Sequence, residues 1–160
     1  MSLNGRKIAI KVALNRRKFD DRASAELYYE NLKEAIFKEV KKIQVLYPEY
    51  VLDYSPDSLK VIEKIYFDYL SNGKFDSGGL TKDEFEVLLA IYYGQVYVAN
   101  GKANWVVLDD LWIKDNRYYL AIRSFNGFYT IECAKWSNHE NRPNNKRKQL
   151  IYREYMKYTK

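Results

Sequence analysis

Apolar residues in the first half of the chain recur every three or four positions, the period of an α-helix with one buried face. The first such stripe lies within residues 21–47 and consists of Tyr28, Leu32, Ile36, Val40, Ile43 and Tyr47. Pro48 follows this stripe. We expect the helix to end there, because the residue before a proline is disfavoured in the α region.

Two further stretches combine the helical period with signals for helix ends. Ser55-Pro56 suits the N-cap and the first position of a second helix, and Gly73 suits its left-handed C-cap. Thr81 to Glu84 form a capping-box sequence that predicts the start of a third helix, which we expect Gly94 to end. The expected buried faces are Leu59, Ile62, Tyr66 and Tyr69 in the second helix, and Phe85, Leu88, Leu89 and Tyr92 in the third.

After Gly94 the pattern changes to short runs rich in Val, Ile, Tyr, Phe and Trp, which favour strands. Asn100-Gly101 and Asn126-Gly127 are typical of the tight turn of a hairpin. The expected strands are 95–99, 103–108, 111–114, 117–123 and 128–136. Residues 6–14 alternate in a way that suits an additional edge strand, and residues 146–157 suit a last helix.

Helices followed by strands are the order of an α+β fold, not the alternation that builds a parallel sheet. We predict one domain in which about three N-terminal helices pack on a four- to five-stranded antiparallel sheet, with a short C-terminal helix. Its parts are a basic arm or edge strand (1–18), a helical part (19–94), an antiparallel meander (95–136) and a basic loop with the last helix (137–160).

Charge is distributed unevenly along the chain. Residues 1–18 carry six Lys or Arg and no acid, and residues 135–160 carry eight Lys or Arg against two Glu, so each end has a net charge of +6. Residues 19–134 hold thirteen basic and nineteen acidic residues, a net charge of −6. An acidic body between basic ends indicates either a charged partner or ends that fold back on the body.

The expected location is the cytoplasm. The apolar runs, such as 87–93, are far too short to span a bilayer, and no apolar region of a signal peptide follows the basic N-terminus. The single cysteine, Cys133, cannot form an internal disulfide, which agrees with a reducing compartment.

No catalytic residue, metal site or cofactor is predicted. One histidine and one cysteine cannot supply the ligands of a zinc site, and His139 with Cys133 lacks the third group that would orient a nucleophilic pair. Gly78 and Glu84 imitate part of a calcium loop, but Phe75 stands where an oxygen ligand is needed. The glycines also lack the Gly-Lys-Ser/Thr ending of a phosphate loop.

The expected partner is a protein. Aromatic residues make up 16% of the chain, and exposed Tyr and Trp side chains often anchor interfaces. An acidic body would suit a basic partner such as a nuclease toxin. The residues predicted to line this contact are Tyr97, Asp109, Asp110, Trp112 and Asp115.

The alternative function is binding of nucleic acid through the basic ends, and an enzyme is the third class. The residues predicted for the nucleic-acid interface are Arg16, Arg17, Lys18, Lys146, Arg147, Lys148 and Arg153. The two binding functions differ in salt dependence, because phosphate contacts release counterions and weaken steeply as salt rises.

A short set of motifs resembles several small bacterial families. These families begin a helix with Ser-Leu-x-x-Ile/Leu-Glu and continue through Tyr-x-Gly to a conspicuous Trp. The matching residues here are Ser58-Leu59, Ile62-Glu63, Tyr92-Tyr93-Gly94 and Trp105. Many members are uncharacterised, and some look like immunity proteins that neutralise polymorphic toxins. The resemblance covers about residues 50–110; it implies a fold and carries over no active site.

Overall fold

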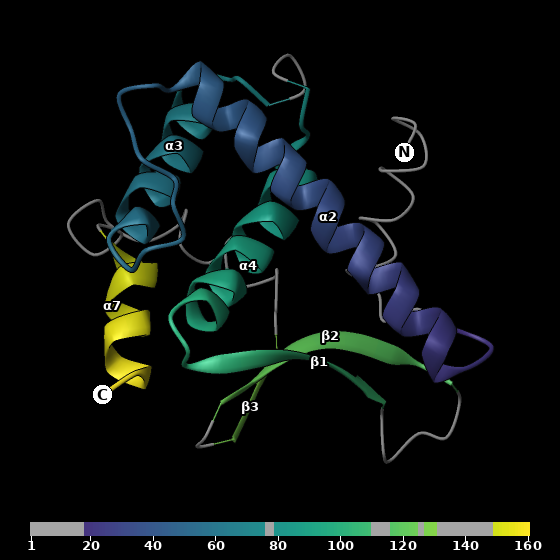
Figure 1. Cartoon of the computed structure of the whole chain (residues 1–160). Helices are drawn as coiled ribbons and strands as arrows, with labels where there is room; N and C mark the ends of the chain where they lie inside the picture. Colours follow the sequence, from purple (N-terminus) through teal and green to yellow (C-terminus); the bar gives the residue numbers. More distant parts are fainter. Residues whose placement is uncertain (1–17, 76–78, 110–115, 125–126, 131–148) are drawn as a thin grey trace.

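A computed structural model of the chain describes residues 18–75, 79–109, 116–124, 127–130 and 149–160. Four helices and three strands lie in these ranges (Figure 1). The helices are α2 (Arg22–Leu46), α3 (Ser58–Ser71), α4 (Lys82–Ala99) and α7 (Leu150–Tyr158). The strands are β1 (Ala103–Asp109), β2 (Tyr118–Ser124) and β3 (Gly127–Thr130). The α+β class is therefore confirmed.

The long helix α2 begins where its sequence supplies a cap. The side chain of Asp21 accepts a hydrogen bond of 2.7 Å from the backbone N–H of Ser24. The predicted apolar stripe is buried from Leu32 to Ile43, but at its start Tyr29 is buried, whereas Tyr28 is only half-buried. The inward face of α2 therefore agrees with the sequence pattern from Leu32 to Ile43 and differs from it by one position only at its start.

The signals at the end of α3 and the start of α4 act as expected, whereas α3 begins at Ser58 after Asp57, later than the predicted start at Ser55-Pro56. Gly73 has a left-handed φ of 61°, and the next residue, Lys74, donates its backbone N–H to Tyr69 at 2.9 Å, which closes α3. Thr81 and Glu84 exchange both hydrogen bonds of the capping box at the start of α4. The predicted buried faces of both helices are confirmed.

The predicted end of the third helix was wrong. Helix α4 continues through Gly94 to Ala99, so 95–99 is helix and not the first strand. Asn100-Gly101 therefore ends a helix instead of joining two strands. Gly101 has φ 70°, and Lys102 donates its backbone N–H to Tyr97 at 2.8 Å, the hydrogen bond of a left-handed helix terminus.

The sheet of the described residues has three antiparallel strands in the order β1-β2-β3, fewer than the four to five expected. One expected strand belongs to α4, and the expected strands at 6–14 and 111–114 lie outside the described residues. Val107 faces Leu120 across β1 and β2, and Ser124 faces Gly127 across β2 and β3. β2 therefore continues to Ser124 and β3 begins at Gly127, whereas strands at 117–123 and 128–136 were predicted; residues beyond Thr130 lie outside the described ranges.

The core lies between the helices and one face of the sheet. In Figure 1, α2 crosses the molecule diagonally, with α4 beneath it and the sheet below both. Tyr66, Phe85 and Tyr92 are fully buried there with the aliphatic side chains of α2, α3 and α4. The C-terminal helix α7 packs against α3, and its Tyr155 ring lies 4.7 Å from that of Tyr97.

Candidate cleft between helix α2 and strand β1

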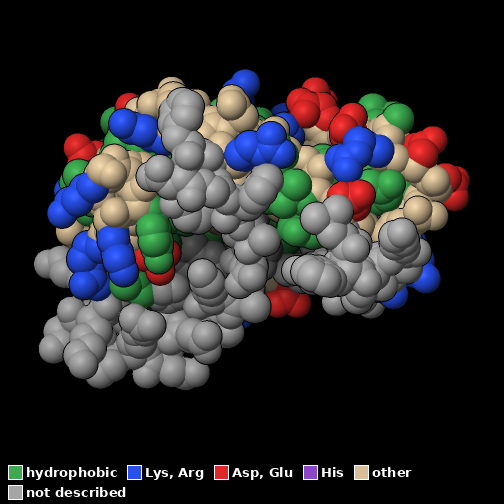
Figure 2. Space-filling model, turned by 90° about the horizontal axis from the view of Figure 1, so that it is seen from below, with side chains coloured by type: hydrophobic (Ala, Val, Ile, Leu, Met, Phe, Trp, Pro, Cys, Tyr) green, Lys and Arg blue, Asp and Glu red, His purple; other side chains and the backbone are tan. Residues whose placement is uncertain are grey.

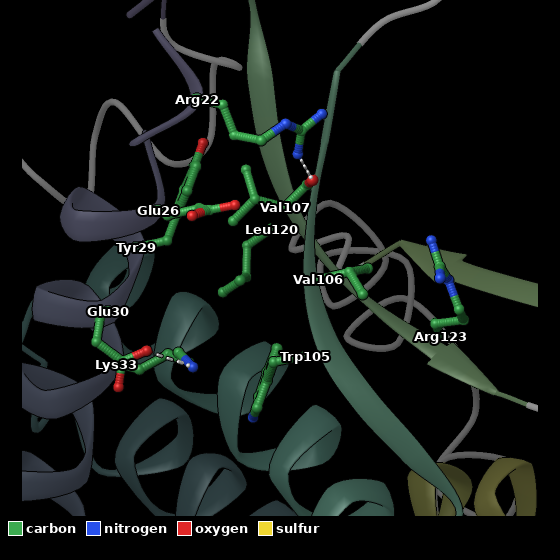
Figure 3. A pocket seen from close by; sticks show the side chains of 10 residues that line it. All are labelled: Arg22, Glu26, Tyr29, Glu30, Lys33, Trp105, Val106, Val107, Leu120 and Arg123. Carbon is green, nitrogen blue, oxygen red and sulfur yellow. Dashed lines mark hydrogen bonds and ion pairs between the residues drawn. The ribbon is translucent and has the colours of Figure 1, made fainter. Parts of the chain in front are cut away.

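An open cleft of about 440 Å³ lies between α2 and the first two strands (Figure 3). Helix α2 supplies one wall, because positions three and four apart point to the same side of a helix. β1 and β2 supply the opposite wall. The lining residues are Arg22, Glu26, Tyr29, Glu30, Lys33, Trp105, Val106, Val107, Leu120 and Arg123.

The floor of the cleft is apolar and held in place. Tyr29 and Leu120 are buried, and the Tyr29 hydroxyl donates a hydrogen bond of 2.8 Å to the carbonyl oxygen of Tyr118. Trp105 is half-buried, and its indole N–H donates to Gln95 of α4 at 2.8 Å. The hydrogen bond to Gln95 therefore orients the Trp105 ring against the cleft.

Two basic side chains of α2 in the cleft are already paired. The guanidinium of Arg22 donates to the carbonyl oxygen of Val107 at 2.5 Å and lies 3.4 Å from Asp109. The ammonium of Lys33 lies 2.9 Å from Glu30 and 5.1 Å from the centre of the Trp105 ring. These contacts neutralise much of the positive charge on this wall.

Glu26 has a different environment. Its side chain is exposed and points across the cleft toward Val107 and Leu120 in Figure 3. Within the part of the chain that the structure describes, it makes no hydrogen bond or ion pair. Glu26 thus leaves one uncompensated negative charge beside the apolar floor.

The predicted protein contact is only partly described. Tyr97 was expected to be exposed, but it is buried, because the strand expected at 95–99 is helix and the ring packs on α7. Asp109 is exposed and reaches the rim of the cleft through its ion pair with Arg22. Asp110, Trp112 and Asp115 lie outside the described residues.

The predicted nucleic-acid residues are described at only two positions. Lys18 is exposed, and its backbone forms an isolated antiparallel β-bridge with Arg117 beside the sheet. The exposed Arg153 is on α7, at the opposite side of the molecule (Figure 1). Arg16, Arg17, Lys146, Arg147 and Lys148 lie outside the described residues. On the face shown in Figure 2, side chains of both charges are interspersed.

The described residues that line the cleft include no serine, threonine, cysteine or histidine that would act as a nucleophile or as an imidazole base. In the described ranges no three His, Cys, Asp or Glu residues are grouped to hold a metal ion. Cys133 and His139 lie outside those ranges. None of the described helices combines the length and the apolarity that crossing a bilayer requires.

The sequence did not identify the α2 wall of the cleft. Glu26, Glu30 and Lys33 are spaced four and three residues apart, which places them on one side of a helix. That spacing was the available signal, but charged residues at such positions usually form a solvated face. Only the fold places β1 opposite them.

These features define an α+β domain with an amphipathic cleft between its longest helix and its first strand. The chain belongs to the family described as uncharacterised protein YwmA, whose model matches residues 18–159. Comparison with curated protein sequences and with solved structures finds no match.

Proposed function

We propose that the protein is a non-enzymatic protein-binding domain and that the cleft between α2 and β1 is its contact site. The observation that carries this proposal is the oriented, half-buried Trp105 beside an apolar floor and a charged rim. Interfaces commonly have this anatomy, with an aromatic anchor at the centre and polar groups around it.

A basic protein is the partner that the charges favour. The chain between residues 19 and 134 has a net charge of −6, and one of its carboxylates, Glu26, lies in the cleft without an ion-pair partner among the described residues. Complementary charge accelerates association and selects among partners. An immunity protein or antitoxin that covers a basic nuclease toxin is the biological role that we propose on this basis.

The test is affinity capture from a lysate of the native organism, with and without nuclease treatment and at two salt concentrations. We expect one stoichiometric protein to remain bound under all conditions. Trp105→Ala should reduce the captured amount, whereas Met156→Ala, which truncates an exposed side chain on α7, should not. Thermal unfolding of both variants checks that they are folded.

Two results would count against the proposal. Loss of all captured material on nuclease treatment would favour the nucleic-acid alternative, because its contacts are to phosphates. Equal capture by Trp105→Ala and the wild type would remove the cleft as the contact site.

A further inference from the structure

The first strand lies at the edge of the described sheet. The strand order β1-β2-β3 leaves β2 on one side of β1, and no described strand on the other. An edge strand of this kind presents unpaired backbone N–H and C=O groups to any extended segment that approaches it.

Two observations show which backbone groups of β1 point to this open edge. In an antiparallel pair, residues whose backbone groups bond the neighbouring strand alternate with residues whose groups point away from it. The Val107 carbonyl oxygen accepts from the Arg22 side chain, so it is accessible from outside the ladder. The backbone groups of Trp105, two residues earlier, point in the same direction as those of Val107.

The register of the second hairpin leads to the same assignment. Ser124 faces Gly127 and only two residues separate them in the sequence, and antiparallel partners joined by so short a connection bond each other. The backbone N–H and C=O groups of every second residue of β2 point to the same side. Those of Leu120, like those of Ser124, therefore point toward β3, and those of Ala121 point toward β1. Ala121 faces Val106, so the backbone groups of Val106 form hydrogen bonds with β2. The backbone groups of Trp105 and Val107, on either side of Val106, therefore point away from β2.

The cleft is open around this edge. Its lining includes Val107, whose side chain is on the helix side of β1, and Val106, whose side chain is on the opposite side. An added strand would therefore place every second side chain between α2 and the floor at Leu120. Its other side chains would lie along Val106.

The charge in the cleft selects the side chain that enters it. Three basic residues line the cleft, and each has contacts of its own: Arg22 is paired with Asp109, Lys33 is paired with Glu30, and Arg123 of β2 also has an interaction partner. Glu26 is without a partner in the described residues and projects into the same space. A lysine or arginine between apolar neighbours would complement both Glu26 and the apolar floor.

We propose that β1 accepts an extended, basic segment of a partner protein as an additional antiparallel or parallel strand, with a Lys or Arg side chain against Glu26. This inference rests on the proposed protein-binding function and specifies how the partner is held. Main-chain hydrogen bonds to β1 would supply affinity, and the α2 wall would supply the preference for a basic residue.

The probes are synthetic nine-residue peptides that alternate apolar and polar positions, with Lys, Arg, Gln or Glu at the centre. Binding to the full chain is measured by fluorescence polarisation of a labelled peptide. We expect the Lys and Arg peptides to bind and the Glu peptide to bind at least about tenfold more weakly. Failure of every peptide to bind would overturn the inference.

Backbone N-methylation tests strand addition without changing the protein. Two sets of peptides carry methyl groups on alternate backbone nitrogens. In one set the methyl groups remove the N–H donors that would face β1, and in the other set they remove the donors that would face solvent. We expect one methylated set to weaken binding about tenfold or more and the other set to have little effect, since each lost hydrogen bond contributes about 0.5–1.5 kcal/mol. Any other pattern would overturn the inference.

Glu26→Gln tests the charge preference, with Glu34→Gln as the control on an exposed part of α2 that does not line the cleft. Glu26→Gln should reduce the preference for Lys over Glu several-fold, and Glu34→Gln should leave it unchanged. An unchanged preference in Glu26→Gln would contradict the assignment of the basic residue.

The failure of this inference can be separated from failure of the proposed function. Val107→Pro removes an outward N–H of β1 and leaves the bonds of Val106 to β2 in place. If folded Val107→Pro captures the native partner as well as the wild type does, strand addition is wrong and protein binding stands. If the wild type captures no protein, both are wrong.

Discussion

The carboxylate of Glu63 caps a helix that begins 87 residues later. Its Oε1 atom accepts a hydrogen bond of 3.1 Å from the backbone N–H of Leu150, the first residue of α7. Glu63 is on α3 and is 3% exposed, and no side chain of α7's own N-cap residue, Gln149, performs this role. The C-terminal helix is therefore held to α3 by a buried acid whose position in the chain gave no indication of this contact.

The protonation of Glu63 should make the stability of the fold depend on pH. Burial raises the pKa of Glu63 from about 4.5 to about 7, although the N–H groups at the start of α7 and the charge of Arg153 oppose the increase. The folded protein therefore binds the proton more tightly than the unfolded chain does. The contribution of Glu63 to the free energy of unfolding should be greatest below about pH 4.5, fall as the pH rises, and level off above about pH 7.

Glu63→Gln should remove this contribution, because the amide keeps an oxygen for Leu150 and does not titrate. At pH 8 the variant should be about 2 kcal/mol more stable than the wild type, and near pH 5 the two should be similar. Urea unfolding at several pH values measures the difference. The control Glu34→Gln, at an exposed position, should retain the pH dependence of the wild type. If Glu63→Gln also retained it, groups other than Glu63 would be responsible for it.

A second prediction concerns the hydroxyl of Tyr92. Burial raises its pKa to about 12, so it stays protonated at neutral pH and donates to Ser58 Oγ at 2.5 Å. It also accepts from the backbone N–H of Tyr54 at 3.2 Å. Tyr54 has a left-handed φ of 60°, which is strained for a residue with a side chain, and its ring stacks on that of Tyr92 at 4.7 Å.

Tyr92→Phe should keep the ring stacking and leave the Tyr54 N–H and the Ser58 hydroxyl without this partner. We expect a loss of about 1–3 kcal/mol in the free energy of unfolding, measured by chemical denaturation. Tyr152→Phe is the control, because the Tyr152 ring contacts Lys60 through its face, with the ammonium 4.1 Å from the ring centre. Equal effects of the two substitutions would show that the Tyr92 hydroxyl contributes nothing specific.

A third prediction concerns the junction between α4 and β1. Gly101 has φ 70°, and a Cβ atom there would meet nothing within 4 Å, so the cost of a side chain is confined to the backbone. Gly101→Ala should destabilise the protein by about 1 kcal/mol, and Gly101→Asn should cost less, because asparagine tolerates the left-handed region better. Thermal unfolding of both variants gives the order, and a larger loss for asparagine would contradict this explanation.

The same junction shows what the sequence could predict. Asn100-Gly101 was interpreted as a hairpin turn, but a helix terminus also needs a residue with positive φ, and Gly101 supplies it here. Gly94 also fits a helix end, yet it lies buried within α4, although glycine in a helix costs about 1 kcal/mol relative to alanine. Local signals with one meaning, such as the capping box at Thr81, were interpreted correctly.

The candidate site was less predictable than the helices because its walls are distant in sequence. Glu26 and Trp105 meet at one cleft only through the packing of α2 on the sheet. Asp109 was predicted from its acidic neighbourhood, and it reaches the cleft through Arg22. Tyr97 was assigned to the surface because its segment was assigned to a strand, and a helix turns the same side chain into the core.

The last prediction follows from the position of Arg22 at the proposed binding edge. Its guanidinium occupies the Val107 carbonyl oxygen that an added strand would need, and its positive charge opposes a basic peptide near Glu26. The side chain is 47% exposed, so its displacement toward Asp109 should cost little. Arg22→Gln should therefore increase affinity for the Lys-centred peptide several-fold and have a smaller effect on the Gln-centred peptide.

The comparison of the two peptides separates these two effects of Arg22. Release of the Val107 carbonyl oxygen should increase the affinity of both peptides equally, whereas removal of the positive charge should increase only the affinity of the Lys-centred peptide. High salt should reduce the second effect and leave the first, because it screens exposed charges. Weaker binding of both peptides by Arg22→Gln would mean that Arg22 contacts the partner directly, and strand addition at Val107 would then have to be abandoned.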